Sequence, residues 1–174
     1  MAYPIRDWAA AAAVDDSIIY FSIDARKYSF LSNMYIHPIR LGKFHYGSAE
    51  AAFQAQKFVN RPDGEATMRL FLDTTPKQAK RLGGPRGRIP RMTPEEVEDW
   101  STRRVDVMRR ILGQKFEDPD LRERLLATGD RKLVERIMTG RGGDSFWGTT
   151  KAKGRGCNVL GCMLMEIRRE IMAK

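Results

Sequence analysis

Hydrophobic and polar positions follow two different periods along this chain. Ser17–Ile23 is rich in β-branched and aromatic residues, which predicts a strand. Ile36–Tyr46 has the pattern of a hairpin that turns at Leu41-Gly42-Lys43. Between them, Tyr28–Met34 is short and polar in its middle, so we expect a loop there. Lys132–Ile137 suits either a short strand or a helical turn.

Most of the remaining chain has helical periodicity with clear start signals. Thr75-Pro76 and Thr93-Pro94 each open a capping box with proline at the first helical position, and Asp118-Pro119 also predicts a helix start. The first of these helices should end at Gly83 and the second near Gly113. The residues expected to face the core are Val97, Trp100, Val107, Met108, Ile111, Leu112, Leu121, Leu125 and Leu126, followed by Leu160, Leu164, Ile167 and Ile171 on a last helix.

These elements predict the fold class. A chain of 174 residues without an internal repeat is long enough for one core. We therefore expect a predominantly helical α+β single domain with a small antiparallel sheet near the N-terminus. Residues 1–16 are expected to be a lead-in or linker, and residues 17–174 the domain.

Composition and charge narrow the function classes. The net charge is +9, from 31 lysines and arginines against 22 acidic residues, which suits a polyanionic partner such as nucleic acid. Two cysteines outside any zinc spacing and two histidines argue against a Cys/His metal site. No apolar run approaches the ~20 residues of a spanning helix. We expect a cytoplasmic protein that uses no metal or cofactor and does not bind membranes.

Ser48–Phe58 carries the most informative pattern. Read as a helix with Ser48 as its N-cap, it places Glu50, Phe53, Gln54 and Lys57 on one stripe, with alanines on the opposite side. A carboxylate, an aromatic ring, an amide and an amine in one column can hold a substrate. The alternative is a solvated polar face, although this face has no i,i+4 charge pairs.

Three further polar clusters are candidate sites, each with a plainer alternative. Ser32-Asn33 lies in the predicted loop, and Asp144-Ser-Phe-Trp147-Gly148 lies in a glycine-rich loop where the tryptophan is either a core plug or a stacking platform. Gly154–Asn158 opens the last helix, where backbone N–H groups can bind phosphate or Asn158 can simply be the N-cap. A cluster of arginines, namely Arg86, Arg88 and Arg91, can meet phosphates or be solvated.

Taken together, these motifs resemble the NADAR superfamily. The resemblance spans Ile18 to Arg168. It includes Leu31-Ser-Asn33, Ser48-x-Glu50-x-x-Phe-Gln-x-Gln-Lys-Phe58, Trp100 with Met108, Lys115-Phe116, Leu125-Leu-Ala-Thr128, Leu133-Val-Glu135, Asp144-x-x-Trp-Gly148 and Gly156-x-Asn-x-Leu-Gly161. Leu31, Ala51 and Thr149-Thr150 depart from the usual family residues. These departures lie around the expected pocket and bear on the substrate rather than the fold.

The resemblance implies cleavage of an N-glycosidic bond to a ribose. Such cleavage requires protonation of the leaving group and stabilisation or capture of C1 of the ribose. We expect Lys57 to be the nucleophile that forms a Schiff base at C1, Glu50 the acid/base, and Asp144 a second carboxylate that positions ribose hydroxyls. The expected substrate-binding residues are Ser32, Asn33, Phe53, Gln54, Trp147, Gly148 and Asn158, with Phe53 and Trp147 flanking a ring.

Two substrate classes are associated with this family. One is ADP-ribose attached to guanine in DNA, whose removal reverses a DNA-modifying toxin. The other is a phosphoribosylamino-pyrimidine intermediate of riboflavin synthesis. The net charge and Arg86, Arg88 and Arg91 favour ADP-ribosylated DNA, with a functional pairing to a DNA ADP-ribosyltransferase toxin. A non-catalytic module that binds ADP-ribose or nucleic acid is a third reading, but such a module does not need both Lys57 and Glu50.

Overall fold

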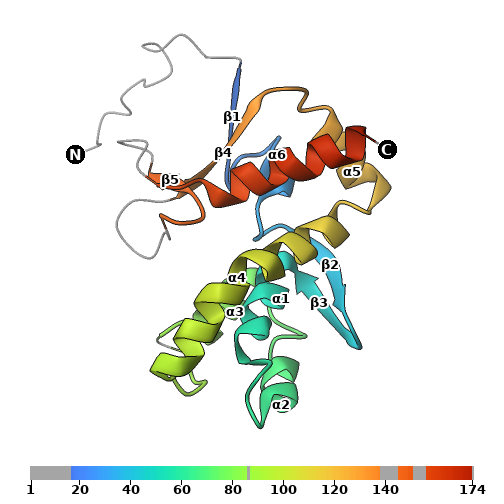
Figure 1. Ribbon diagram of the computed structural model, residues 1–174. Coiled ribbons are helices and arrows are strands. Elements are labelled where there is room, and N and C mark those ends of the chain that lie inside the picture. Colours follow the sequence, from blue (N-terminus) through green and yellow to red (C-terminus); the bar gives the residue numbers. More distant parts are fainter. Residues whose placement is uncertain (1–16, 86, 138–144, 151–155, 174) are drawn as a thin grey trace, which may run out of the picture.

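The computed structural model describes residues 17–85, 87–137, 145–150 and 156–173. These residues form a predominantly helical α+β fold, which confirms the predicted class (Figure 1). In chain order the elements are β1 (Ile18–Phe21), η2 (Ser29–Leu31), β2 (Ile36–Leu41), β3 (Phe44–Ser48), α1 (Ala49–Ala55), η3 (Gln56–Phe58), α2 (Gly64–Arg69), α3 (Pro76–Leu82), α4 (Pro94–Lys115), α5 (Pro119–Leu126), β4 (Lys132–Ile137), β5 (Thr149–Thr150) and α6 (Val159–Met172).

Two small sheets lie at different places in the fold. β2 and β3 form an antiparallel hairpin, as predicted, and its turn uses Gly42 with a φ of 58°, a value that favours glycine. β1, β4 and β5 form a separate parallel sheet with β4 in the centre. The sequence did not predict this parallel pairing, because strand-forming residues do not identify their partner. The strand β4 also decides between the two readings of Lys132–Ile137.

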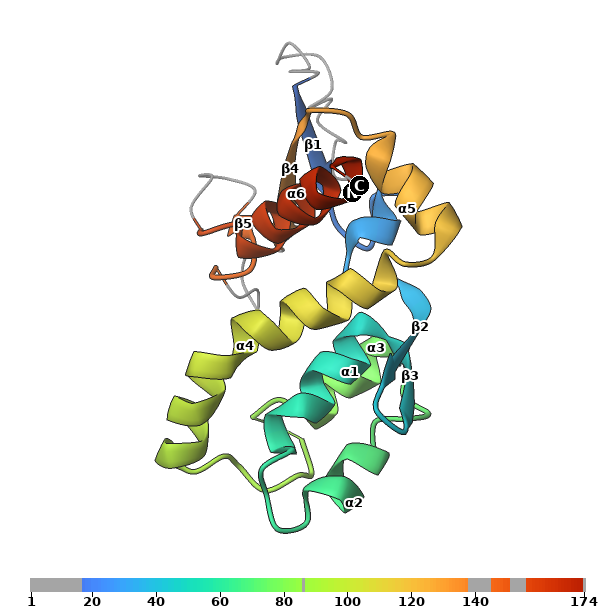
Figure 2. The same cartoon turned by 45° about the vertical axis from the view of Figure 1, so that its right-hand side comes forward.

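The long helix α4 joins the two halves of the molecule. Figure 2 shows α4 between α6 with β4 on one side and α1, α3 and the hairpin on the other. It contacts α1, β2 and α6, and it buries Trp100, Met108, Ile111 and Leu112 as expected. Val97 is a correction: we expected it in the core, but it is 52% exposed, since it lines an open cavity beside the first turn of α4.

Local capping explains where the helices begin. Both predicted capping boxes are present, Thr75 with Gln78 and Thr93 with Glu96. The Asp118 side chain accepts a hydrogen bond from Leu121 N. Three elements were not predicted: α2, the short strand β5, and the 3-10 turn η2 inside the expected loop. Within the described residues, no helix is both long and apolar enough to span a membrane.

Helix α1 lies in the interior. All seven of its residues are buried, between α3, α4 and the β2–β3 hairpin. Its alanines, among them Ala51, Ala52 and Ala55, are completely covered, since their small side chains let neighbouring elements approach closely. The polar stripe on α1 is therefore not a solvated face.

Candidate functional site

A cavity of about 440 Å³ lies between α1, α4 and β4. Its volume is in the usual range for small-molecule sites. Its walls come from α1 and η3 (Glu50, Phe53, Gln54, Lys57), α4 (Trp100, Arg104, Met108), β4 (Glu135, Ile137), α3 (Lys80) and three loop segments (Asn33-Met34, Gly84-Pro85 and Trp147).

The four residues of the predicted stripe all line this cavity. The α-helix ends at Ala55 and continues as the 3-10 turn η3, so Ser48–Phe58 is not one regular α-helix as expected. Lys57 nevertheless stays on the cavity side and donates a hydrogen bond to the Gly83 carbonyl at 3.2 Å. The structure thus brings Glu50, Phe53, Gln54 and Lys57 together in one wall.

The carboxyl group of Glu50 is in a position to hold a proton. Its side chain is buried, and Gln54 Nε2 donates a hydrogen bond to Glu50 Oε1 at 2.8 Å. Desolvation raises the pKa of Glu50, while the Gln54 hydrogen bond and the charges of Lys80 and Lys57 partly oppose the rise. A carboxyl group whose pKa is raised by burial is suited to donate a proton near neutral pH.

The Ser32-Asn33 turn supports Glu50 from behind. The Asn33 carbonyl accepts a hydrogen bond from Glu50 N at 3.0 Å, so the turn fixes the first turn of α1. Asn33 lines the cavity, whereas Ser32 does not: its hydroxyl accepts from Met34 N at 3.2 Å. The Ser32 carbonyl accepts from the buried amine of Lys115 at 2.8 Å. Ser32 therefore shapes the site rather than facing it.

Three buried polar atoms of the cavity residues have no hydrogen-bond partner among the described residues. They are Asn33 Oδ1, Gln54 Oε1 and Arg104 Nε. Buried polar groups in folded proteins are almost always paired with protein atoms or with water, so these atoms of the cavity wall are available to a polar ligand. Two acceptors and one cationic donor match the hydroxyls and phosphates of a ribose phosphate.

The aromatic residues form one continuous wall. The Phe53 ring contacts Trp100 at a centroid distance of 4.8 Å and Trp147 edge-to-face at 5.3 Å. We expected Phe53 and Trp147 to flank a substrate ring, but rings this close leave no space for another between them. Trp100, expected only as core, also lines the cavity. A ligand would contact this wall from one side.

Asn158 and Gly148 have structural positions outside the cavity lining. Asn158 Oδ1 accepts from Glu135 N and Asn158 Nδ2 donates to the Leu133 carbonyl, both at 2.9 Å, so its amide is held by β4. Asn158 is the N-cap of α6 by position, with a φ of 53°, but its side chain does not cap the helix. A Cβ at Gly148 would lie 2.7 Å from Ile137 Cγ2, which explains why glycine is needed beside β4.

Two predicted site residues, Asp144 and Arg86, lie outside the described residues. Arg88 and Arg91 are exposed and do not line the main cavity, although Arg91 lines a neighbouring one. Within the described ranges, no group of three or more His, Cys, Asp or Glu side chains is arranged to hold a metal ion. Independence of metal remains a prediction.

The sequence analysis missed three charged residues of the cavity: Lys80, Arg104 and Glu135. Arg104 was the most accessible of them, because it lies four residues from both Trp100 and Met108 and hence on their helical face. Its guanidinium lies 3.8 Å from the centre of the Phe146 ring. Glu135 stands in the motif Leu133-Val-Glu135 but was not assigned to the site, and Lys80 carries no comparable signal, since its segment approaches α1 only in the folded chain.

Comparison with known proteins identifies one matching family model and several similar proteins. A family model described as the NADAR domain matches residues 20–172. The N-glycosidase YbiA of Escherichia coli K12 is 33% identical over 169 residues, 97% of each chain. An N-glycosidase of Nostoc punctiforme is 36% identical over 155 residues, 88% of this chain and 92% of that protein.

Two further relatives extend the comparison. A riboflavin biosynthesis protein of Vibrio vulnificus is 35% identical over 154 residues, which make up 88% of this chain and 38% of that protein. The NMR structure of E. coli YbiA superimposes with a TM-score of 0.72 at 31% identity, and the match covers 98% of this chain and 94% of that one.

Proposed function

The chain belongs to the NADAR domain family, as its motifs predicted, and we propose that it is an N-glycosidase that removes ADP-ribose from guanine in DNA. One observation carries the reaction class. A buried carboxyl group with a raised pKa, Glu50, and the amine of Lys57 line one cavity in which Asn33 Oδ1 and Gln54 Oε1 have no partner among the described residues. Proton donor, nucleophile and sugar-hydroxyl acceptors are the groups that the reaction requires.

In the proposed reaction, Glu50 first donates its proton to the ribose ring oxygen. The ring opens as the C1–oxygen bond breaks, which leaves a cationic C1=N bond to the guanine nitrogen. The neutral amine of Lys57 adds to C1, one of its protons passes to the guanine nitrogen, and the bond from C1 to guanine breaks. Water then adds to the resulting lysine imine and releases ADP-ribose and Lys57.

The remaining cavity residues fit this sequence. The amine of Lys57 must lose its proton before it attacks, which neighbouring cations favour, and Lys80 and Arg104 line the same cavity. Arg104 also offers a guanidinium to the pyrophosphate. In this proposal Asp144 positions ribose hydroxyls. Glu135 supplies a further carboxylate in the described part of the cavity wall.

The choice of nucleic acid rests on charge. The net charge of +9 and the exposed Arg88 and Arg91 suit a substrate with several phosphates, for which contacts to phosphate supply much of the affinity. The proposed physiological partner is accordingly ADP-ribosylated DNA made by a DNA ADP-ribosyltransferase toxin.

A second candidate substrate is a phosphoribosylamino-pyrimidine of riboflavin synthesis. The observation in its favour is the match to a riboflavin biosynthesis protein of Vibrio vulnificus. Such a substrate contains the same ribose and phosphate, so the same Glu50 and Lys57 would act on it.

The test is direct. Purified protein is incubated in EDTA with a guanine-ADP-ribosylated oligonucleotide and, separately, with the riboflavin intermediate, and released products are followed by mass spectrometry. We expect free ADP-ribose and intact guanine. Lys57→Ala should be inactive, while Lys77→Ala, a change at an exposed lysine of α3, should be fully active. Faster turnover of the riboflavin intermediate would overturn the substrate, and a requirement for divalent metal would overturn the cofactor-free reaction.

A further inference from the structure

A second cavity, of about 300 Å³, lies next to the first and shares part of its wall. The two cavities have Lys57, Gly84 and Pro85 in common, so the predicted nucleophile lies at their boundary. The hydrogen bond from Lys57 Nζ to the Gly83 carbonyl holds the amine there. A molecule bound at Lys57 therefore has access to both spaces.

The second cavity differs from the first in chemistry. Its walls are mostly apolar, with Phe58, Leu82, Ile89 and Met92 among them, and the described residues that form them include no carboxylate. Arg91 lines the cavity from its exposed side. An apolar slot bordered by a guanidinium favours a flat ring that carries a nearby phosphate.

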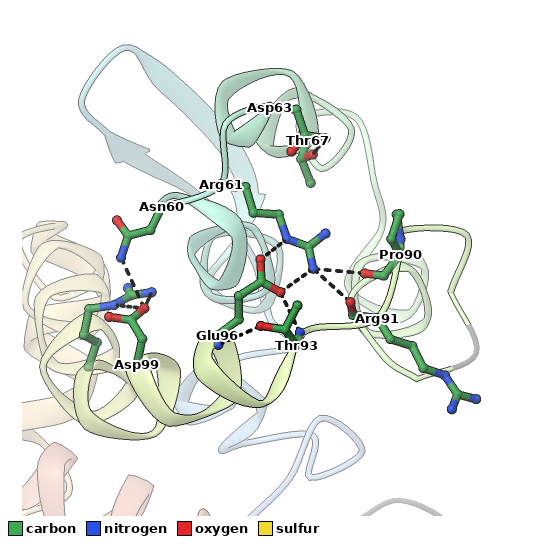
Figure 3. A network of polar contacts seen from close by, with 10 residues as sticks. Asn60, Arg61, Asp63, Thr67, Pro90, Arg91, Thr93, Glu96 and Asp99 are labelled. Atoms are coloured by element: carbon green, nitrogen blue, oxygen red, sulfur yellow. Dashed lines mark hydrogen bonds and ion pairs between the residues drawn. The ribbon is translucent and has the colours of Figure 1, made fainter.

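A partly buried ion pair holds one wall of the second cavity in place. Arg61 Nε and Nη2 each donate to the Glu96 carboxylate at 2.7 Å, and Arg61 Nη2 also donates to the carbonyls of Pro90 and Arg91 at 3.1 and 3.2 Å. Figure 3 shows this network, with the Arg91 side chain directed away from it. The backbone of the wall is thus fixed, and among the described residues nothing pairs with the Arg91 guanidinium, as in a preformed site.

Val97 provides a second indication of a ligand. This side chain lines the cavity from the first turn of α4 and is 52% exposed, although it follows the apolar pattern of the helix. An apolar ring that covers this side chain would remove its exposed apolar surface from water, which favours binding.

We infer that the second cavity binds the leaving base, so that the scissile bond lies at the Lys57 boundary with the sugar and pyrophosphate in the first cavity. This inference rests on the proposed function. In an N-glycoside, C1 joins the sugar to the base, and a nucleophile that meets C1 therefore has the sugar on one side and the base on the other. The unpaired hydroxyl acceptors and Arg104 suit the sugar side, and the apolar slot with Arg91 suits guanine and its neighbouring phosphate.

The test uses the two products as separate probes. We would measure the affinities of ADP-ribose and of 2′-deoxyguanosine 5′-monophosphate by calorimetry, each alone and in the presence of the other. We expect both to bind at once. Val97→Glu should weaken deoxyguanosine monophosphate about tenfold or more, because a carboxylate enters the slot and repels phosphate, while ADP-ribose is unaffected. Glutamate is favoured in a first helical turn, so this variant should fold.

Leu70→Glu is the matched control, because Leu70 is also exposed, at 42%, and lines neither cavity. It should leave both affinities unchanged. Competition between the two probes, or unaltered affinity of Val97→Glu for deoxyguanosine monophosphate, would overturn the two-cavity assignment. Failure of the wild-type protein to cleave ADP-ribosylated guanine overturns the proposed function instead, whatever the binding results are.

Discussion

Lys115 gives the sharpest prediction about how the site is built. It is the last residue of α4, its side chain is completely buried, and its amine donates to the Ser32 carbonyl behind the site. Desolvation, with a smaller contribution from the charge of Arg124, lowers the pKa of Lys115 to about 7. Among the described residues, no carboxylate forms an ion pair with it.

The sign of the effect on stability follows from linkage. The unfolded chain holds this proton up to a pKa of about 10.4, so between about pH 7 and 10.4 it binds more protons than the folded chain. Stability must therefore rise with pH in this window. The destabilisation is complete below pH 7 and absent above 10.4. Integrated between pH 6 and pH 9, the rise due to Lys115 alone is about 3 kcal/mol.

Lys115→Met removes the titrating group and retains a side chain of similar length. The Ser32 carbonyl keeps its hydrogen bond from Tyr35 N at 3.2 Å, so it is not left unpaired. The free energy of unfolding, measured in urea at several pH values, should rise by about 3 kcal/mol less in Lys115→Met than in the wild type between pH 6 and pH 9. Comparison of the two proteins cancels the titrations of groups that do not interact with Lys115; His37 is not one of them, because its pKa is lowered by desolvation and also by the charge of Lys115.

Lys77→Met is the control, since it makes the same change at an exposed lysine of α3. It should keep the wild-type pH dependence. If Lys115→Met also keeps it, the buried amine does not titrate between pH 6 and pH 9, and our account of how Lys115 supports the Ser32-Asn33 turn is wrong.

Three further results are expected. Glu50→Gln should slow cleavage severely while ADP-ribose still binds. It should also remove the decline in rate that the wild type shows as pH rises through the raised pKa of Glu50. A pH–rate profile that is the same in both proteins would refute the role of Glu50 as the acid. Turnover of a modified oligonucleotide should fall steeply between about 50 and about 200 mM salt, and that of a modified mononucleotide much less; equal dependence would mean that Arg88 and Arg91 do not contact DNA. Asn158→Leu should lower the free energy of unfolding in urea by about 2–4 kcal/mol, because it removes the two hydrogen bonds that the Asn158 amide makes with β4. A decrease in this free energy smaller than that of a substitution at an exposed site would contradict the role of Asn158 in holding β4.

The helical stripe of the site could be read from the sequence, because i, i+3, i+4 and i+7 spacing depends only on local geometry. Glu50, Phe53, Gln54 and Lys57 face one cavity for that reason. Their burial could not be read in the same way. It results from α3, α4 and the hairpin, which close over α1 only in the folded chain.

Long-range pairing was the main limit on prediction. The parallel β1–β4 sheet joins distant segments, and its pairing is accompanied by the packing of α6 against β4, which the sequence does not reveal. Asn158 illustrates the consequence: its position before a helix suggested an N-cap or a phosphate site, but its amide instead binds β4. Val97 followed the apolar helical pattern yet is half exposed, because its turn of α4 borders the second cavity.

The proposed reaction requires that Lys57 form a covalent imine with C1 of the ribose while the base departs. The most direct measurement is to add borohydride during cleavage of ADP-ribosylated guanine and to locate the reduced adduct by peptide mass spectrometry. Our account predicts an adduct on Lys57 and no activity in Lys57→Arg, whose guanidinium holds phosphate but cannot form the imine. An active Lys57→Arg protein with no trapped adduct would contradict it.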